Sequence, residues 1–181
     1  MKINIGGGRK VYEGFLNLDI DPSCNPDIIV DLEIDKLPFE DNTIEEVKAY
    51  HILEHLGQGF FHLFQELYRV CKHGTIIDIQ VPHPLHLNFI TDPTHMRPVT
   101  TDGMNMFSKK ANDEWIATNS TTSCLAYRFG VDFEVISSEL IVDPFYHSIL
   151  PGMKEEDQMR LAREVNNFFM EIYMKLVVIK C

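Results

Sequence analysis

Short apolar runs separated by polar turns fill the first eighty residues of the chain. Such runs, with one helix-spaced segment between two of them, are typical of strands and helices that alternate along an α/β domain with a parallel sheet. The predicted strands are Lys2 to Ile5, Phe15 to Ile20, Asp27 to Leu32, Glu46 to Tyr50 and Thr75 to Val81.

A helix is predicted between the last two of these strands, over Gln58 to Lys72. Apolar residues recur there at the spacing of one helical face, and Gly74 follows a cationic turn as a stop signal. Further elements are predicted as a helix around Ala111 to Trp115, a strand over Phe133 to Val142, an amphipathic stripe over Met153 to Met170 and a strand over Tyr173 to Ile179.

Composition limits the classes of protein to which the chain can belong. Its 181 residues predict a single domain spanning 1–181. The formal charge of −11 and the lack of any Lys/Arg run disfavour a nucleic-acid partner. No apolar stretch reaches the length of about 18 residues that spans a bilayer, and no signal-peptide pattern opens the sequence. We therefore expect a cytoplasmic protein with no membrane association.

The cysteines, Cys24, Cys71, Cys124 and Cys181, form no CxxC pair. Neither a zinc knuckle nor a redox motif is therefore indicated. In a reducing compartment we expect these thiols to be reduced.

Gly6, Gly7 and Gly8 directly follow the first predicted strand, where absent side chains let a ligand approach the backbone. The full dinucleotide fingerprint fails because Val11 stands at the third glycine position, so the triplet alone is equally consistent with a simple turn. Asp19 ends the next apolar run, where a carboxylate can accept both hydroxyls of a ribose. Taken by itself it is also consistent with a solvated strand end.

Two more polar positions lie at strand ends, Asp31 at the end of the third strand and His51 at the end of the fourth. The carboxyl ends of parallel strands meet at one edge of a sheet, and ligands of open α/β sheets bind there. The glycines, Asp19, Asp31 and His51 are therefore expected to share one rim.

In this order the motifs resemble class I S-adenosylmethionine-dependent methyltransferases, particularly the methyltransferase-11-like type. The matching segments cover about residues 1–82: the strand and glycine loop at 3–8, LNLDID at 16–21, DL at 31–32, LPFEDNTIEEV at 37–47, HILEHL at 51–56 and ELYRVCKHGT at 66–75. The resemblance implies a Rossmann-like three-layer sandwich around a mostly parallel seven-stranded sheet whose last strand is antiparallel.

The resemblance also implies S-adenosylmethionine as cofactor. By position, Gly6 and Gly8 would face the amino-acid moiety of the cofactor, Asp19 the ribose hydroxyls, Asp31 with Leu32 the adenine, and Tyr50 or His51 the methionine end. Gly7 and Ile20 are further cofactor-binding candidates. The sequence departs from the family after the first strand, because about nine residues separate Ile5 from Phe15 and a helical crossover needs about a dozen. The first helix is expected to be reduced to a loop or one turn.

Residues 82–98 have no clean period and read as a long loop that carries His83, His86, Asp92, His95 and Arg97. His83 and His95 are the candidates for taking a proton from a nucleophile. A structurally capped loop is one alternative.

The other alternative is a metal-dependent hydrolase that uses His83, His86, Asp92 and His95 as ligands. The methyltransferase interpretation assigns no metal site. Glu54 and His55 are interpreted as the capped start of the following helix.

The predicted function is transfer of a methyl group to a small-molecule or protein acceptor. A catalytically silent cofactor-binding module is the remaining alternative. Nothing in the sequence specifies the acceptor or an oligomeric state.

Overall fold

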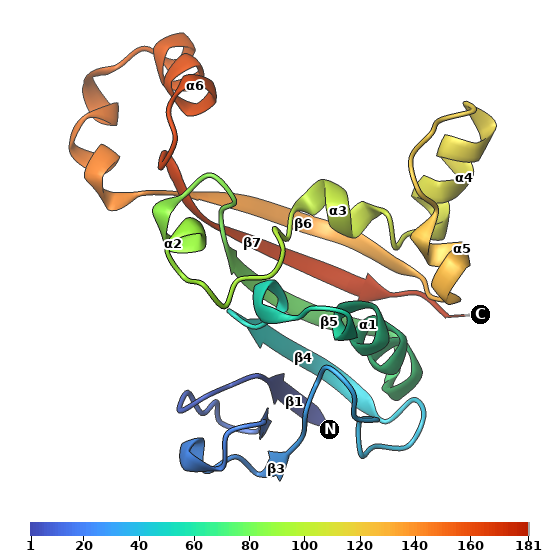
Figure 1. Cartoon of the computed structure of the whole chain (residues 1–181). Coiled ribbons are helices and arrows are strands. Elements are labelled where there is room, and N and C mark those ends of the chain that lie inside the picture. Colours follow the sequence, from blue (N-terminus) through green and yellow to red (C-terminus); the bar gives the residue numbers. More distant parts are fainter. Residues whose placement is uncertain (181) are drawn as a thin grey trace.

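Seven strands form one sheet in the computed structural model, which describes residues 1–180. They are β1 (Lys2–Ile5), β2 (Leu16–Asp19), β3 (Ile28–Ile29), β4 (Ile44–Tyr50), β5 (Cys71–Pro82), β6 (Phe133–Val142) and β7 (Phe169–Val178). Their spatial order is β3-β2-β1-β4-β5-β7-β6, and β7 alone runs antiparallel to its neighbours (Figure 1). The predicted mostly parallel sheet with an antiparallel last strand is confirmed.

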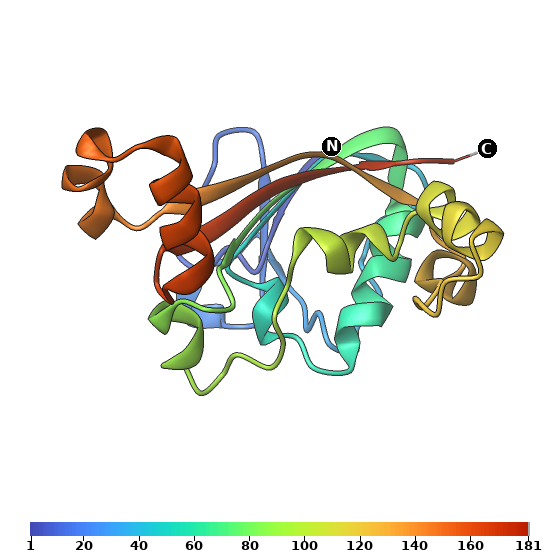
Figure 2. The ribbon, with the colours of Figure 1, turned by 90° about the horizontal axis from the view of Figure 1, so that it is seen from above.

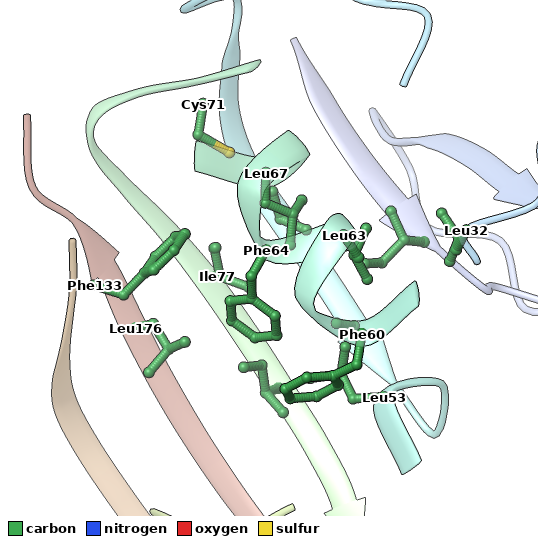
Figure 3. Close-up of a cluster of buried hydrophobic side chains, with 14 of the residues drawn as sticks. Leu32, Leu53, Phe60, Leu63, Phe64, Leu67, Cys71, Ile77, Phe133 and Leu176 are labelled. Carbon is green, nitrogen blue, oxygen red and sulfur yellow. The ribbon is translucent and has the colours of Figure 1, made fainter. Parts of the chain in front are cut away.

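Helix α1 (Gly59–Val70) covers one face of this sheet. Its buried side chains recur at helical spacing, as the sequence predicts, and Figure 3 shows Phe60, Leu63 and Phe64 among core residues of the sheet such as Ile77 and Leu176. Burial of each large apolar side chain contributes about 1.5–3 kcal/mol. This layer is the main hydrophobic core.

The remaining helices follow β5 and β6 in the sequence. They are α2 (Leu87–Ile90), α3 (Thr101–Asn105), α4 (Lys109–Ala117), α5 (Leu125–Phe129) and α6 (Glu155–Glu164), with 3-10 turns η1 (Pro22–Cys24), η2 (Leu53–His55), η3 (Pro144–Ser148) and η4 (Leu150–Gly152). In Figure 2, α3 lies on the same side of the sheet as α1, and the segment joining β1 to β2 lies on the other side.

The opposite face of the sheet carries polar side chains. Along β4, Val47 and Ala49 are buried, whereas Glu46 and Lys48 alternate with them and are partly exposed. No helix of residues 1–180 lies over the centre of this face (Figure 2). Of the predicted three layers, the one on this side is reduced to the connection 6–15.

Ion pairs and hydrogen bonds link neighbouring strands across this polar face. Lys2 Nζ lies 2.6 Å from Glu46 Oε2, and the Gln80 amide donates to Glu171 at 2.7 Å. Exposed pairs of this kind contribute at most about 1 kcal/mol each. They pair polar groups of this face with one another, whereas the buried apolar side chains of α1 belong to the core on the opposite face.

Several predicted boundaries are wrong. The last strand, β7, begins at Phe169 rather than Tyr173, so the stripe predicted over Met153 to Met170 is helical only over Glu155–Glu164. Strand β3 has only Ile28 and Ile29, because the Asp31 carbonyl already accepts turn hydrogen bonds from the N–H groups of Ile34 and Asp35. The predicted glycine stop of α1 is not its end, because β5 begins at Cys71 and Gly74 lies within it at φ +81°.

Cys24, Cys71 and Cys124 are free thiols, and Cys181 lies outside the described residues. Within residues 1–180, every helix is too short or too polar to cross a membrane.

A buried ionic network ties α1 to the loop before β4. The Glu66 carboxylate accepts from the Leu37 N–H at 2.9 Å and from Arg69 Nε at 2.9 Å. Arg69 also donates to the carbonyls of Leu37 and Phe39. The Arg69 guanidinium holds the pKa of Glu66 below its ordinary value.

Glu66→Gln is expected to lower the free energy of unfolding at pH 7 by about 1.5–3 kcal/mol, because it removes hydrogen bonds to a charged group. The folded pKa of Glu66 is depressed, so its stabilisation is complete above the unfolded value of about 4.3 and is lost as pH falls through the folded value. Urea unfolding from pH 7 to pH 3 measures this difference. Glu164→Gln on the exposed side of α6 is the control, and an equal cost of Glu66→Gln at every pH would contradict the account.

Candidate functional site

The glycine turn, residues 6–8, leaves the carboxyl end of β1 without forming a helix. Gly6 and Gly8 have φ of +58° and +53°, values that L side chains rarely adopt. The turn is tied to β2 by the Gly7 N–H, which donates to the Leu18 carbonyl at 3.2 Å. The expected loss of the first crossover helix is confirmed.

Two buried asparagines stabilise the glycine turn and the residues after it through side-chain hydrogen bonds. The Asn4 amide donates to Asn17 Oδ1 at 2.7 Å and to the Lys10 carbonyl at 3.0 Å, and the Asn17 amide donates to the Gly8 carbonyl at 3.0 Å. Both side chains are only 2% exposed. A Cβ on Gly7 would lie 1.8 Å from Asn17 Oδ1, so only glycine fits there.

Asp19 ends β2 beside this turn. Its Oδ2 accepts from the Gly8 N–H at 2.7 Å, and its Oδ1 accepts from the Asp21 N–H at 2.9 Å. A carboxylate oxygen offers about two acceptor positions, so each oxygen retains one. Asp19 is therefore oriented by the backbone and can still accept two further hydrogen bonds.

The other predicted cofactor residues at this edge follow β2 and β3. Asp31 Oδ1 accepts from the Glu33 N–H at 2.9 Å, Leu32 is buried and Ile20 is 59% exposed. The Val30 N–H donates to the Asp19 carbonyl at 3.0 Å, which links the two strand ends. The carboxyl ends of β1, β2 and β3 thus meet at one rim, as the sequence predicts.

At the end of β4, the side chains of Tyr50 and His51 contact different groups. The Tyr50 hydroxyl donates to Asp78 at 2.7 Å on the polar face, where its ring meets Tyr12 of the 6–15 connection. Burial and the Asp78 carboxylate raise the pKa of Tyr50. The side chain of Tyr50 is thus engaged on the polar face, and that of His51 turns toward other groups.

His51 lies between two carboxylates, with Nδ1 3.5 Å from Glu54 and Nε2 3.4 Å from Glu171. The Glu54 carboxylate raises the pKa of His51. The next residue, Ile52, packs on the glycine turn, since a Cβ on Gly6 would lie 2.3 Å from Ile52 Cγ1. The end of β4 is therefore adjacent to the end of β1.

Within the loop 82–98, the side chains of His83 and His86 have different surroundings. His83 borders a cavity of about 380 Å³ with Thr100, Thr101 and Ser138 among its lining residues, and burial lowers the pKa of His83. His86 is buried and bonds to Asp143 at 2.9 Å, which makes it a structural side chain of the loop.

His95 instead meets two residues of η2. Ligand atoms of Glu54, His55 and His95 all lie within 4.8 Å of one another, the one group of this kind among residues 1–180. Of the four ligands weighed from the sequence, Asp92 and His95 approach each other at 3.8 Å, but within residues 1–180 the four do not gather into one metal-binding group.

The interpretation of Glu54 as a helix cap is wrong. Glu33 caps α1 instead, because its carboxylate accepts the N–H groups of Gly57 and Gly59. Glu54 is 1% exposed and has no hydrogen-bond partner. The sequence interpretation also missed Asn4 and Asn17, although an asparagine inside each of two neighbouring apolar strands was a visible signal.

Solved structures with a similar fold include S-adenosylmethionine-dependent enzymes. A SAM dependent methyltransferase from Archaeoglobus fulgidus is 17% identical over 97% of this chain and 85% of that chain, with a TM-score of 0.66. Phosphoethanolamine N-methyltransferase 2 from Haemonchus contortus, in complex with S-adenosyl-L-methionine, is 12% identical over 99% of this chain and 48% of that chain, with a TM-score of 0.50.

The same fold also carries another chemistry. The [4+2]-cyclase SpnF is 11% identical over 99% of this chain and 75% of that chain, with a TM-score of 0.57. No family model and no curated protein matches the sequence. The chain has the fold of class I S-adenosylmethionine-dependent methyltransferases, and its chemistry has to be argued from its site.

Gly7→Ala and Gly8→Ala separate the packing of the turn from its backbone conformation. Gly7→Ala is expected to cost about 2–4 kcal/mol of unfolding free energy, because its Cβ displaces the buried Asn4–Asn17 pair. At Gly8 a Cβ would meet nothing within 4 Å, so Gly8→Ala should cost only about 1 kcal/mol, from its positive φ. Denaturant unfolding measures both values, and equal costs would contradict this view of the turn.

Proposed function

We propose that this chain is an S-adenosylmethionine-dependent methyltransferase that acts on a small-molecule or protein acceptor. One observation carries the proposal. The glycine turn and the Asp19 carboxylate lie side by side at the carboxyl ends of two adjacent strands, at the switch point of the sheet order, where ligands of such sheets bind.

The residues of the rim fit an adenosine cofactor. The free acceptor positions of Asp19 suit the two ribose hydroxyls, with the exposed Ile20 beside them. Asp31 and Leu32 would bind the adenine. The open space around Gly8 lets the amino-acid moiety approach the backbone of the turn.

The methionine end would lie between the glycine turn and the end of β4. When bound, the cofactor supplies an electrophilic methyl group on a sulfonium. The chain contributes His51 and the two carboxylates that flank it, a charged set next to the Ile52 contact with Gly6. Holding a nucleophile about 3–3.5 Å from the methyl in a water-poor pocket is the main catalytic requirement.

The acceptor side is assigned to the loop 82–98. Burial keeps His83 neutral at neutral pH by lowering its pKa, so its ring can accept a proton from a hydroxyl or amine. The cavity that it borders offers the hydroxyls of Thr100, Thr101 and Ser138 to a polar acceptor. His95 is the second candidate base, because Nδ1 bonds to the Phe89 carbonyl at 2.8 Å and so leaves Nε2 as an acceptor.

Asp19→Asn tests the cofactor site. Isothermal titration with S-adenosylhomocysteine is expected to detect binding by the parent and at least about tenfold weaker binding by the variant, about 1.4 kcal/mol, because a charge-assisted bond to the ribose is lost. Asp27→Asn is the matched control. Asp27 also accepts one backbone N–H, that of Asn17 at 2.7 Å, but it lies before β3, at the amino-terminal end of that strand.

The control variant should retain the parent's affinity. Equal affinity of Asp19→Asn and the parent, with both variants folded, would contradict the ribose assignment. Failure of the parent to bind the cofactor product would contradict the proposed function itself.

A measurement of methyl transfer distinguishes the proposed enzyme from a cofactor-binding module without activity. Release of S-adenosylhomocysteine in the presence of hydroxyl, amine and carboxylate acceptors measures it.

A further inference from the structure

The Glu54 carboxylate is buried without a hydrogen-bond donor. Both of its oxygens are inaccessible and unpartnered, and the nearest charged group is the His51 ring at 3.5 Å. An ionised carboxylate away from water is costly unless a cation or a full set of donors compensates it. Within residues 1–180, the Glu54 carboxylate is thus compensated by its ion pair with His51 and by no hydrogen bond.

Two histidines complete a compact cluster around this carboxylate. The ring centroids of His55 and His95 are 4.6 Å apart, and one ligand atom from each residue lies within 4.8 Å of the other two. The side chain of His95 is only 7% exposed. One carboxylate and two imidazoles can surround a single ion at this separation.

Hydrogen bonds through Nδ1 orient both imidazoles, and Nε2 of His95 lies 3.8 Å from the Asp92 carboxylate, beyond hydrogen-bond distance. His95 Nδ1 donates to the Phe89 carbonyl at 2.8 Å. The Thr94 hydroxyl donates to Asp92 at 2.6 Å, so it accepts from His55 Nδ1 at 2.9 Å. Metal-ligating histidines characteristically donate their second ring N–H in this way, which fixes the tautomer.

The two segments that supply the cluster are fixed to each other through the backbone. The N–H groups of Met96 and Arg97 donate to the Glu54 carbonyl at 2.8 and 3.3 Å. Arg97 Nε donates to the Leu56 carbonyl at 2.9 Å, and its guanidinium stacks on Phe60 with 4.4 Å to the ring centroid. The cluster is therefore preorganised.

We propose that Glu54, His55 and His95 bind one divalent transition-metal ion, in which case His95 is a ligand and His83 alone remains the candidate base. Two imidazole nitrogens and one carboxylate oxygen suit zinc, iron(II), cobalt(II) or manganese(II) better than magnesium or calcium, which prefer oxygen ligands alone. Three protein ligands leave coordination positions open. The ligand Glu54 follows Ile52 by two residues in the sequence, and the Ile52 side chain packs on the glycine turn.

Cobalt(II) titration of chelator-treated protein without a histidine tag tests the site. Visible absorption bands and equilibrium dialysis should report one bound ion per chain, and zinc(II) should displace it. The expected loss of cobalt affinity is at least about tenfold in Glu54→Gln and in His95→Asn. The asparagine amide can still donate to the Phe89 carbonyl, so that variant preserves the loop.

His147→Ala, an exposed histidine of η3, is the control and should bind cobalt as the parent does. Circular dichroism and thermal unfolding verify that each variant is folded. No stoichiometric binding by the parent would overturn the proposal and leave His51 as the counter-charge of Glu54. Unchanged affinity in both cluster variants would place the ion elsewhere and would also overturn it. Because no cofactor is added, neither result depends on S-adenosylmethionine binding.

Discussion

Side chains of two strands stabilise the turn after β1, where a related fold would place a helix. The connection to β2 is too short for a helical crossover, so the Asn4–Asn17 pair and the Asp19 carboxylate satisfy the backbone groups of the turn instead. Buried polar groups must be hydrogen-bonded, and this network meets that requirement at 2% exposure. The same bonds place a carboxylate beside a bare backbone, which is the arrangement on which the cofactor site depends.

Loss of that helix has a second consequence on the polar face of the sheet. Parallel sheets are ordinarily covered on both faces and have nearly continuous apolar strands. Here β4 and β5 alternate, with Glu46, Lys48 and Asp78 on the polar face and Val47 among the residues under α1. The rim at the strand ends therefore rests on a single packed layer, in which α1 and the network around Glu66 connect the helix to the sheet.

The sequence predicts the elements whose pattern is local. The bounds of β1 and β6 agree with the prediction, because periodicity within one run determines them. The alternation along β4 is also visible in the sequence, and it indicates one polar face of the sheet. The Glu54, His55 and His95 cluster was not predictable, because its ligands come from segments about forty residues apart that only the tertiary fold joins.

A crystal structure of the chain with S-adenosylhomocysteine tests the central claim most directly. The account predicts both ribose hydroxyls within hydrogen-bond distance of the Asp19 carboxylate, and the amino-acid end of the ligand alongside Gly6 and Gly8. A nucleoside bound elsewhere, or an Asp19 side chain turned away from the sugar, would contradict it.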